Sequence, residues 1–249
     1  MIRGRLYLLT AGIALILAVC GAYKRNEVWT DRIVLWTDTV RKSPSKARPH
    51  YMLGMAYRAA GSKHEAMGQY QTAVTIDPNY AMAFNGLGNL YLDSGDTAQA
   101  VEYFTRALLL NKNYVDALIN LGIACKTAGA ANQAIEYFQK ALQQAPDRLI
   151  AHFELANAFR DAGYIDRAVA EYTTAIRLDA DYPQAYYNLG NVYRETGELD
   201  KAIGLYVRPG KRVWVAGACR NFHHYSVYNY VAEQEYQRRH GRRVHRYAG

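Results

Sequence analysis

Amide and cationic side chains recur at fixed places along the middle of this chain. Residues 47–206 divide into five successive blocks of 34 residues, the last of them incomplete, and similar polar side chains return in each block. A cation stands at the twelfth place in four blocks, as Arg58, Lys126, Arg160 and Arg194. Amides stand at the fifth, sixth or ninth place, as Asn85, Asn89, Asn120, Asn157, Asn188 and Asn191. Amides hydrogen bond to peptide backbone and cations attract carboxylates, so this set suits an extended, acidic ligand.

These polar residues have a second interpretation, in which they satisfy one another. The asparagines would then form hydrogen bonds between adjacent helices. The cations would pair with acidic residues that follow at the thirteenth place of three blocks, namely Asp93, Asp161 and Glu195. The sequence leaves both interpretations open.

Small and aromatic residues define the blocks, which begin at Ala47, Ala81, Val115, Leu149 and Pro183. The fifteenth place is always glycine, at Gly61, Gly95, Gly129, Gly163 and Gly197. The twentieth place is always alanine, and the twenty-fourth is aromatic, at Tyr70, Phe104, Phe138, Tyr172 and Tyr206. Two antiparallel helices approach closely where one offers Gly or Ala and the other a flat ring. The glycine is expected to end the first helix in a left-handed cap, and Pro78 and Pro146 are expected to stop the second helix.

This pattern resembles the tetratricopeptide repeat, in five copies that cover residues 47–80, 81–114, 115–148, 149–182 and, truncated, 183–206. The resemblance implies an all-α, right-handed solenoid of helix-turn-helix repeats. It also implies that the first helix of each block lines a concave groove, with the polar residues named above pointing inward. They are therefore our predicted partner-binding residues.

Enzyme motifs are absent from the sequence, which has no GxSxG, no GxxxxGK[ST], no GxGxxG after a strand and no HExxH. His50 and His152 occupy the core-facing fourth place, so packing accounts for them better than catalysis. The three cysteines lie far apart, and no histidine spacing suits a metal. We expect a non-enzyme without cofactor or metal.

The net charge of +8 lies mainly at the two ends of the chain. Residues 1–25 carry four basic and no acidic side chains, residues 26–206 carry 17 basic and 20 acidic, and residues 207–249 carry nine and two. A nucleic-acid groove would place basic side chains throughout the folded body, so we expect no nucleic-acid partner.

Residues 6–23 carry no charge and are flanked by Arg3, Arg5, Lys24 and Arg25. Such a run is just long enough to cross a bilayer. Residues 1–25 are therefore expected to form a single-pass membrane anchor, with the repeats on the periplasmic or extracytoplasmic side. A cleaved signal peptide remains the alternative.

The segments that flank the repeats differ from them. Residues 26–46 fit the phase of a second helix, with Trp36 at the aromatic place and Pro44 at the proline place, and are expected to form a half-repeat cap. Residues 207–249 lack leucine and are rich in Arg, Tyr and His. They are interpreted as a basic, disordered extension, an out-of-frame end, or short strands that pack on the last repeat. In the fifth block Pro209 and Gly210 are expected to end the second helix about one turn early.

Residues 24–54 carry a second resemblance. The Arg-Asn, Trp and Leu-Trp in KRNEVWTDRIVLWTDTVRKSPSKARPHYMLG are similar to the junction in membrane glycosyltransferases of the protein O-mannosyltransferase type, where the last membrane helix leads into repeats. The leading prediction is a membrane-anchored, non-catalytic adaptor that binds a protein or peptide in its groove. The alternatives are a non-catalytic fragment or subunit of such a glycosyltransferase, and a solenoid that self-associates into filaments.

Overall fold

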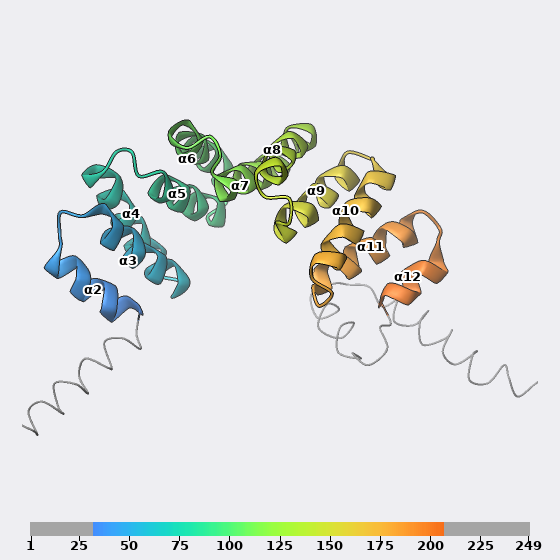
Figure 1. The fold of residues 1–249 in the computed structure, drawn as a ribbon, viewed down its shortest axis with the longest axis horizontal. Coiled ribbons are helices and arrows are strands. Elements are labelled where there is room, and N and C mark those ends of the chain that lie inside the picture. Colours follow the sequence, from blue (N-terminus) through green and yellow to red (C-terminus); the bar gives the residue numbers. More distant parts are fainter. Residues whose placement is uncertain (1–31, 207–249) are drawn as a thin grey trace, which may run out of the picture. The chain divides into compact units, whose positions relative to one another are not determined.

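The structure, a computed structural model, describes residues 32–206, and these residues form α-helices without any strand (Figure 1). The all-α fold expected from the sequence is therefore confirmed. The chain divides into two compact units, residues 1–129 and residues 130–249. Their described parts, residues 32–129 and 130–206, are here named the N-terminal unit and the C-terminal unit.

Each unit is built from pairs of helices joined by short turns. The N-terminal unit contains α2 (Arg32–Lys42), α3 (Ala47–Ala59), α4 (Lys63–Ile76), α5 (Ala81–Asp93), α6 (Thr97–Leu110) and α7 (Val115–Thr127). The C-terminal unit contains α8 (Ala131–Gln144), α9 (Leu149–Asp161), α10 (Ile165–Leu178), α11 (Pro183–Glu195) and α12 (Leu199–Tyr206). The odd-numbered helices from α3 to α11 are the first helices of the blocks, and each begins at the first residue of its block.

The first helix of each block ends two residues before the glycine of the fifteenth place, which caps it in the left-handed conformation that the sequence predicts. Gly61 has a φ of +79°, in the left-handed region that favours glycine. Its N–H donates to the carbonyl of Arg58 at 3.0 Å, and the N–H of Ser62 donates to that of Tyr57 at 2.9 Å. These two bonds form a Schellman motif, which satisfies carbonyls at the end of α3 and turns the chain into α4.

The second helices end without needing a proline. Helix α4 stops two residues before Pro78, but α6 and α10 stop at the same place in blocks that have no proline there. The oxygen Oδ1 of Asp77 accepts a hydrogen bond from the N–H of Asn79 at 2.9 Å, and Asn111 and Asp179 bond in the same way. This side-chain turn at the thirty-first place therefore accompanies the helix end in the first, second and fourth blocks, and Pro78 adds to it in the first block.

Aromatic rings at the twenty-fourth place lie against the small residues of the first helices. A Cβ atom added to Gly54 would lie 2.6 Å from Cε1 of Tyr70, and one added to Gly86 would lie 2.9 Å from its Cζ. The ring of Tyr70 is thus held between α3 of its own block and α5 of the next block. The side chain is 2% exposed. This contact fixes how successive first helices are spaced within the unit.

Helix α2 packs on α3 and occupies the place of a second helix at the start of the N-terminal unit. The Nε2 atom of His50 lies 2.9 Å from the carbonyl oxygen of Pro44, just after α2. In the C-terminal unit, the Nε2 atom of His152 contacts the carbonyl of Pro146 in the same way, at 2.8 Å. Residues before the first full block thus make the same contact as the end of a complete block.

Several expectations fall on residues outside the described range. They concern the membrane anchor at residues 6–23, the start of the half-repeat, the early end of the fifth block after Tyr206 and the tail at 207–249. Within residues 32–206, no helix has both the length and the apolar character needed to span a bilayer.

Candidate functional site

The first helices of the N-terminal unit present a continuous stripe of side chains. On α5 it consists of Met82, Asn85, Asn89 and Asp93, which share one helix face because they are spaced three or four residues apart. Side-chain hydrogen bonds connect α5 to α3, between Arg58 and Asp93, and to α7, between Asn120 and Asn85. These aligned stripes of α3, α5 and α7 are named the N-terminal face.

Asn85 and Asn120 bond to each other across this face. The Nδ2 atom of Asn120 donates to Oδ1 of Asn85 at 3.0 Å and links α7 to α5. Asn85 is only 6% exposed and also lies close to the Tyr114 hydroxyl, whose pKa is raised mainly by burial. A buried amide needs such partners, because an unpaired polar group away from water is costly. These two asparagines therefore act chiefly between helices.

Arg58 of α3 pairs with Asp93 of α5, across two blocks. Its Nη2 and Nε atoms both lie 3.0 Å from Oδ2 of Asp93, and both side chains are well exposed. An exposed pair of this kind contributes about 0–1 kcal/mol to stability. Lys126 stands at the equivalent place of α7 and is half-buried. Arg58 thus has an acidic neighbour, as the second interpretation of the sequence expects.

Asn89 differs from the other asparagines. It is half-buried, and no residue in the described part of the chain forms a hydrogen bond with its side chain. In its block the twenty-fourth place holds Phe104, which has no hydroxyl group. Two exposed apolar side chains belong to the same face, Met55 at 44% and Met82 at 38% exposure. An open amide with exposed methionines is an arrangement that suits a peptide ligand.

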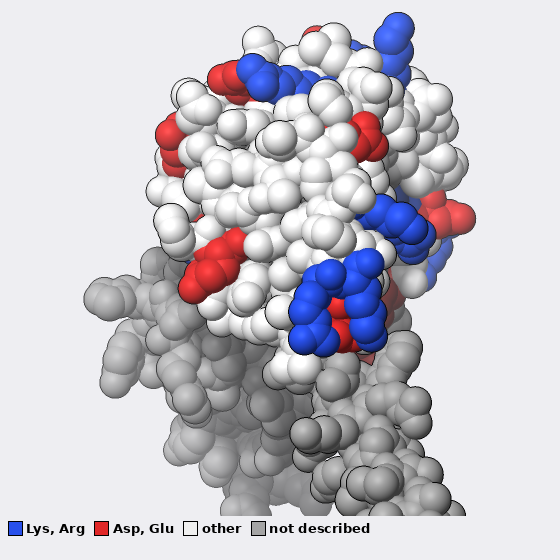
Figure 2. Space-filling model, turned by 90° about the vertical axis from the view of Figure 1, so that its left-hand side faces the viewer, with Lys and Arg blue, Asp and Glu red and all other residues white. Residues whose placement is uncertain are grey.

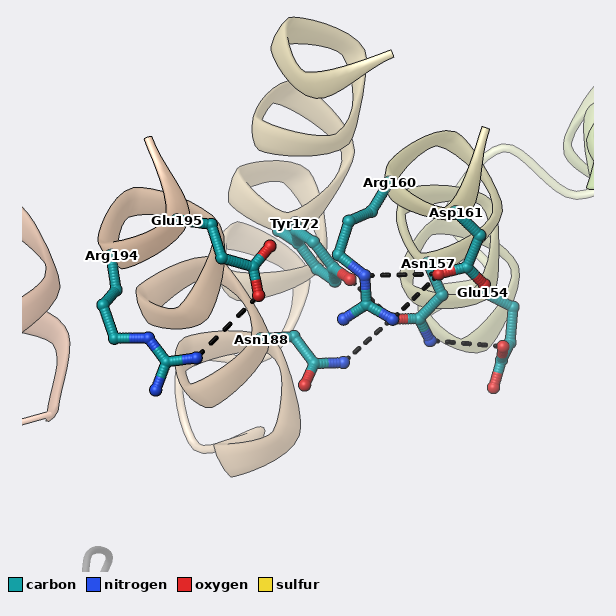
Figure 3. Close-up of polar contacts among 8 residues, drawn as sticks. All are labelled: Glu154, Asn157, Arg160, Asp161, Tyr172, Asn188, Arg194 and Glu195. Atoms are coloured by element: carbon teal, nitrogen blue, oxygen red, sulfur yellow. Dashed lines mark hydrogen bonds and ion pairs between the residues drawn. The ribbon is translucent and has the colours of Figure 1, made fainter. Parts of the chain in front are cut away.

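The C-terminal unit carries equivalent residues on α9 and α11, but there they bond to one another (Figure 3). Oδ1 of Asn157 accepts two hydrogen bonds, from the Tyr172 hydroxyl at 2.5 Å and from Nδ2 of Asn188 at 2.8 Å. Nδ2 of Asn157 donates to Glu154 at 3.3 Å. Asn157 is 6% exposed, and burial raises the pKa of Tyr172. The amide oxygen of Asn157 is therefore fully used within the unit, and its nitrogen donates one hydrogen bond there.

The cations of the C-terminal unit also have partners. Nη2 of Arg160 lies 3.0 Å from Oδ1 of Asp161, the next residue on α9 (Figure 3). Arg194 and Glu195 form a longer contact of 3.9 Å. Asn191 accepts a hydrogen bond from the Tyr206 hydroxyl at 2.7 Å. Of these groups, Arg194 is the least firmly paired.

The predicted site residues thus separate into two sets. Most of them take part in bonds between or within first helices, while Asn89 remains open. Met82 and the hydroxyls of Tyr172 and Tyr206 were not among the residues predicted from the sequence. The signal was available in the latter case, because Tyr at the twenty-fourth place coincides with Asn at the ninth in the fourth and fifth blocks.

His50 and His152 lie in the packing between helices. His50 is buried, with Nδ1 at 2.8 Å from Oε1 of Gln69, and His152 has Nδ1 at 2.6 Å from Oε2 of Glu171. Together with their contacts to Pro44 and Pro146, these bonds use both ring nitrogens. Among residues 32–206, no three His, Cys, Asp or Glu side chains come together as metal ligands would.

Lysine and arginine side chains do not form a broad basic surface on the face of the molecule shown in Figure 2. Uncharged side chains predominate there, and basic and acidic groups are interspersed. This face is the side of the molecule where α2, α3 and α4 lie in Figure 1. It lacks the continuous basic stripe of a nucleic-acid groove.

Two family models match the repeats. A TPR repeat model matches residues 54–95 and 156–197, and a tetratricopeptide repeat model matches residues 85–148. The chain carries tetratricopeptide repeats. The sequence prediction of this repeat, abbreviated TPR, is thereby confirmed. Among curated protein sequences, none matches the chain.

Solved structures share the TPR fold. A crystal structure of MamA is similar at 25% identity, with a TM-score of 0.55, over 61% of this chain and 90% of that one. YrrB, described as a TPR protein with an unusual peptide-binding site, matches at 21% identity and a TM-score of 0.57, over 74% of this chain and 97% of that one. MamA from Desulfovibrio magneticus RS-1 matches at 18% identity and a TM-score of 0.59, over 64% and 90%.

Proposed function

We propose that this TPR chain is a non-catalytic adaptor that holds an extended peptide or protein segment against its first helices, chiefly on the N-terminal face. The observation that carries the proposal is Asn89, an amide without a side-chain partner in the described residues, on a face with exposed Met55 and Met82. The peptide-binding site attributed to YrrB supports the same class of ligand.

Each group on the N-terminal face has a role that fits its chemistry. The amide of Asn89 donates to and accepts from the backbone of an extended peptide, whatever the side chains of that peptide. The flexible thioethers of Met55 and Met82 adapt to its apolar side chains. Arg48, at the second place of α3, is exposed, lies near Tyr80 and forms no ion pair with a described residue. It is the group we assign to a ligand carboxylate.

Net charge favours an acidic ligand on the N-terminal unit rather than on the C-terminal unit. Residues 32–129 carry ten basic and seven acidic side chains, whereas residues 130–206 carry seven basic and eleven acidic. Complementary charge speeds encounter and selects the partner, even where it adds little affinity. In the C-terminal unit, Arg160 and Asn157 already have partners, so a ligand there would first have to replace those bonds.

The proposal is tested with the full-length chain. A partner captured by the immobilised chain is reduced to the shortest peptide that still binds, and its affinity is measured by calorimetry for the wild type, Asn89→Ala and Asn132→Ala. Asn132 is an exposed asparagine on the second helix α8 and serves as the matched control. Asn89→Ala should weaken binding by about 0.5–1.5 kcal/mol, a few-fold to roughly tenfold. Equal affinities of the two variants would remove the N-terminal face from the proposal.

The remaining expectations stay proposals. Anchoring through residues 6–23, an extracytoplasmic location and the glycosyltransferase alternative rest on the sequence alone, and so does self-association into filaments. A capture experiment from detergent-solubilised membranes tests the glycosyltransferase alternative. If the captured partner is a multi-pass glycosyltransferase subunit, the alternative is favoured over an independent adaptor.

A further inference from the structure

The aromatic ring at the twenty-fourth place normally has a first helix on each side. Tyr70 lies between Gly54 of its own block and Gly86 of the next, and Tyr172 hydrogen bonds to Asn157 of its own block and lies next to Asn188 of the next. Tyr70 is 2% exposed and Tyr172 is 0% exposed. Two flanking first helices are therefore what fully buries this ring.

Tyr206 has such a neighbour on one side within the described residues. A Cβ atom added to Gly190 of α11 would lie 2.5 Å from its Cε1, and its hydroxyl donates to Asn191 on the same helix. No following first helix is present in residues 32–206, and Tyr206 is only half-buried. On the same helix, Leu199 is 42% exposed. Helices α11 and α12 therefore carry a surface that no residue of 32–206 covers, at the place where a further repeat would pack. It is named here the terminal face.

Residues 207–249 follow Tyr206 directly, so they begin at the terminal face. Pro209 and Gly210 oppose continuation of the helix and allow the chain to turn back. The segment VWVAGA, residues 213–218, supplies apolar side chains that include Trp214. A short tether keeps such a segment at an effective concentration of roughly millimolar, so modest contacts suffice for docking.

Charge also favours residues 207–249 as the segment that covers the terminal face. Residues 207–249 carry nine basic and two acidic side chains, whereas the C-terminal unit carries seven basic and eleven acidic. Asp200 on α12 is exposed and forms no ion pair with a described residue. A basic segment with an apolar core thus complements the terminal face in both respects.

We propose that residues 207–249 fold back within the same molecule and cover the terminal face of α11 and α12, so that the tail takes the place of a following repeat. This interaction is separate from ligand binding on the N-terminal face. A competing occupant is a second copy of the chain, which would make the cover depend on protein concentration.

Cys219 lies within the tail and serves as a probe of the fold-back. The full-length chain with Cys20→Ser leaves Cys125, which is buried, and Cys219 as its thiols. The rate of Cys219 modification by a disulfide reagent is compared with the rate for a synthetic peptide of residues 207–249. A covered tail should react about tenfold more slowly than the peptide, at every protein concentration. Equal rates would overturn the proposal, and so would protection that appears only as concentration rises, because a second copy would then supply the cover.

A matched pair of substitutions locates the covering contact. Leu199→Asp places a charge on the terminal face, and Leu109→Asp places one at an exposed leucine of α6, which is 75% exposed. Both side chains lie at the surface, so neither change disturbs the core. Leu199→Asp should raise the Cys219 rate towards that of the peptide, and Leu109→Asp should leave it unchanged. The same response from both variants would show that the tail does not dock on α12.

Discussion

The N-terminal and C-terminal units share one repeat but use their asparagines differently. In the C-terminal unit, the hydroxyls of Tyr172 and Tyr206 hydrogen bond to Asn157 and Asn191. In the second block of the N-terminal unit the aromatic residue is Phe104, and Asn89 has no side-chain partner in the described residues. Where the residue at the twenty-fourth place has a hydroxyl group, the asparagine of the ninth place is bonded internally. Where it is phenylalanine, as in the second block, the asparagine is open to a ligand.

The largest effect is expected at the eighth place, where the second block has glycine and the fourth block has alanine. A Cβ atom on Gly88 would lie 2.5 Å from Cε1 of the buried Phe104, whereas the fourth block, in the C-terminal unit, holds Ala156 at this place. Gly88→Ala should destabilise the N-terminal unit by about 3 kcal/mol, near the upper end of overpacking costs. Ala156→Gly should cost only about 1 kcal/mol, as expected for glycine within a helix. Urea unfolding followed by circular dichroism measures both changes in stability. Equal losses of stability would contradict the close packing of Phe104 against Gly88.

A smaller difference is expected from removing an amide in each unit. Asn157→Ala leaves the buried Tyr172 hydroxyl without its acceptor and should cost about 2 kcal/mol. Asn89→Ala breaks no hydrogen bond among described residues and should change stability by less than about 0.5 kcal/mol. If Asn89→Ala proved as destabilising as Asn157→Ala, Asn89 would be structural rather than a binding group.

Phe104→Tyr should make the N-terminal unit resemble the C-terminal unit. The added hydroxyl would donate to Asn89, as Tyr172 does to Asn157. We expect a gain in stability of about 0.5–1.5 kcal/mol, together with weaker ligand binding because the amide is then occupied. Thermal unfolding and calorimetric titration of the same sample measure the two quantities. Unchanged affinity in a more stable protein would separate Asn89 from the ligand.

Alkaline pH should act on both units through their tyrosines. Burial raises the pKa of Tyr70 and of Tyr206 to about 12, from a reference value of 10.0. A pKa raised in the folded state means that the protonated phenol is favoured there, so its contribution is complete below pH 10 and is lost as the pH rises through 12. Tyr70→Phe should therefore move the alkaline unfolding midpoint upward by a fraction of a pH unit. The absorbance of tyrosinate, recorded against pH, measures this unfolding midpoint. A Tyr70 phenol that titrates near pH 10 would contradict the burial of its ring.

The helical fold follows from the sequence because its determinants are local or strictly periodic. Gly61 and its equivalents end the first helices in a left-handed conformation, and the small residues at Gly54 and Gly86 hold the ring of Tyr70. The second-helix ends were only partly anticipated. Side-chain turns at Asp77, Asn111 and Asp179 accompany helix ends that the proline argument did not cover.

The bonding partners of the polar residues could be predicted less fully from the sequence. Both Arg58 and Arg160 stand at the twelfth place, but Arg58 reaches Asp93 on the next first helix and Arg160 turns to the adjacent Asp161. Such a choice depends on side-chain rotamers and on small differences in helix spacing, which a repeat pattern does not encode. The sequence therefore predicted the right kinds of partner and left the particular pairs open.

Methionine methyl groups provide the most direct test of where the ligand binds. The chain has five methionines, all within residues 1–82, and Met67 lies on the second helix α4 as an internal control. NMR spectra of the methyl-labelled chain, recorded during titration with the captured peptide, should show the Met55 and Met82 signals moving while that of Met67 stays in place. Saturable binding that leaves the Met55 and Met82 signals unchanged would contradict a ligand on the N-terminal face.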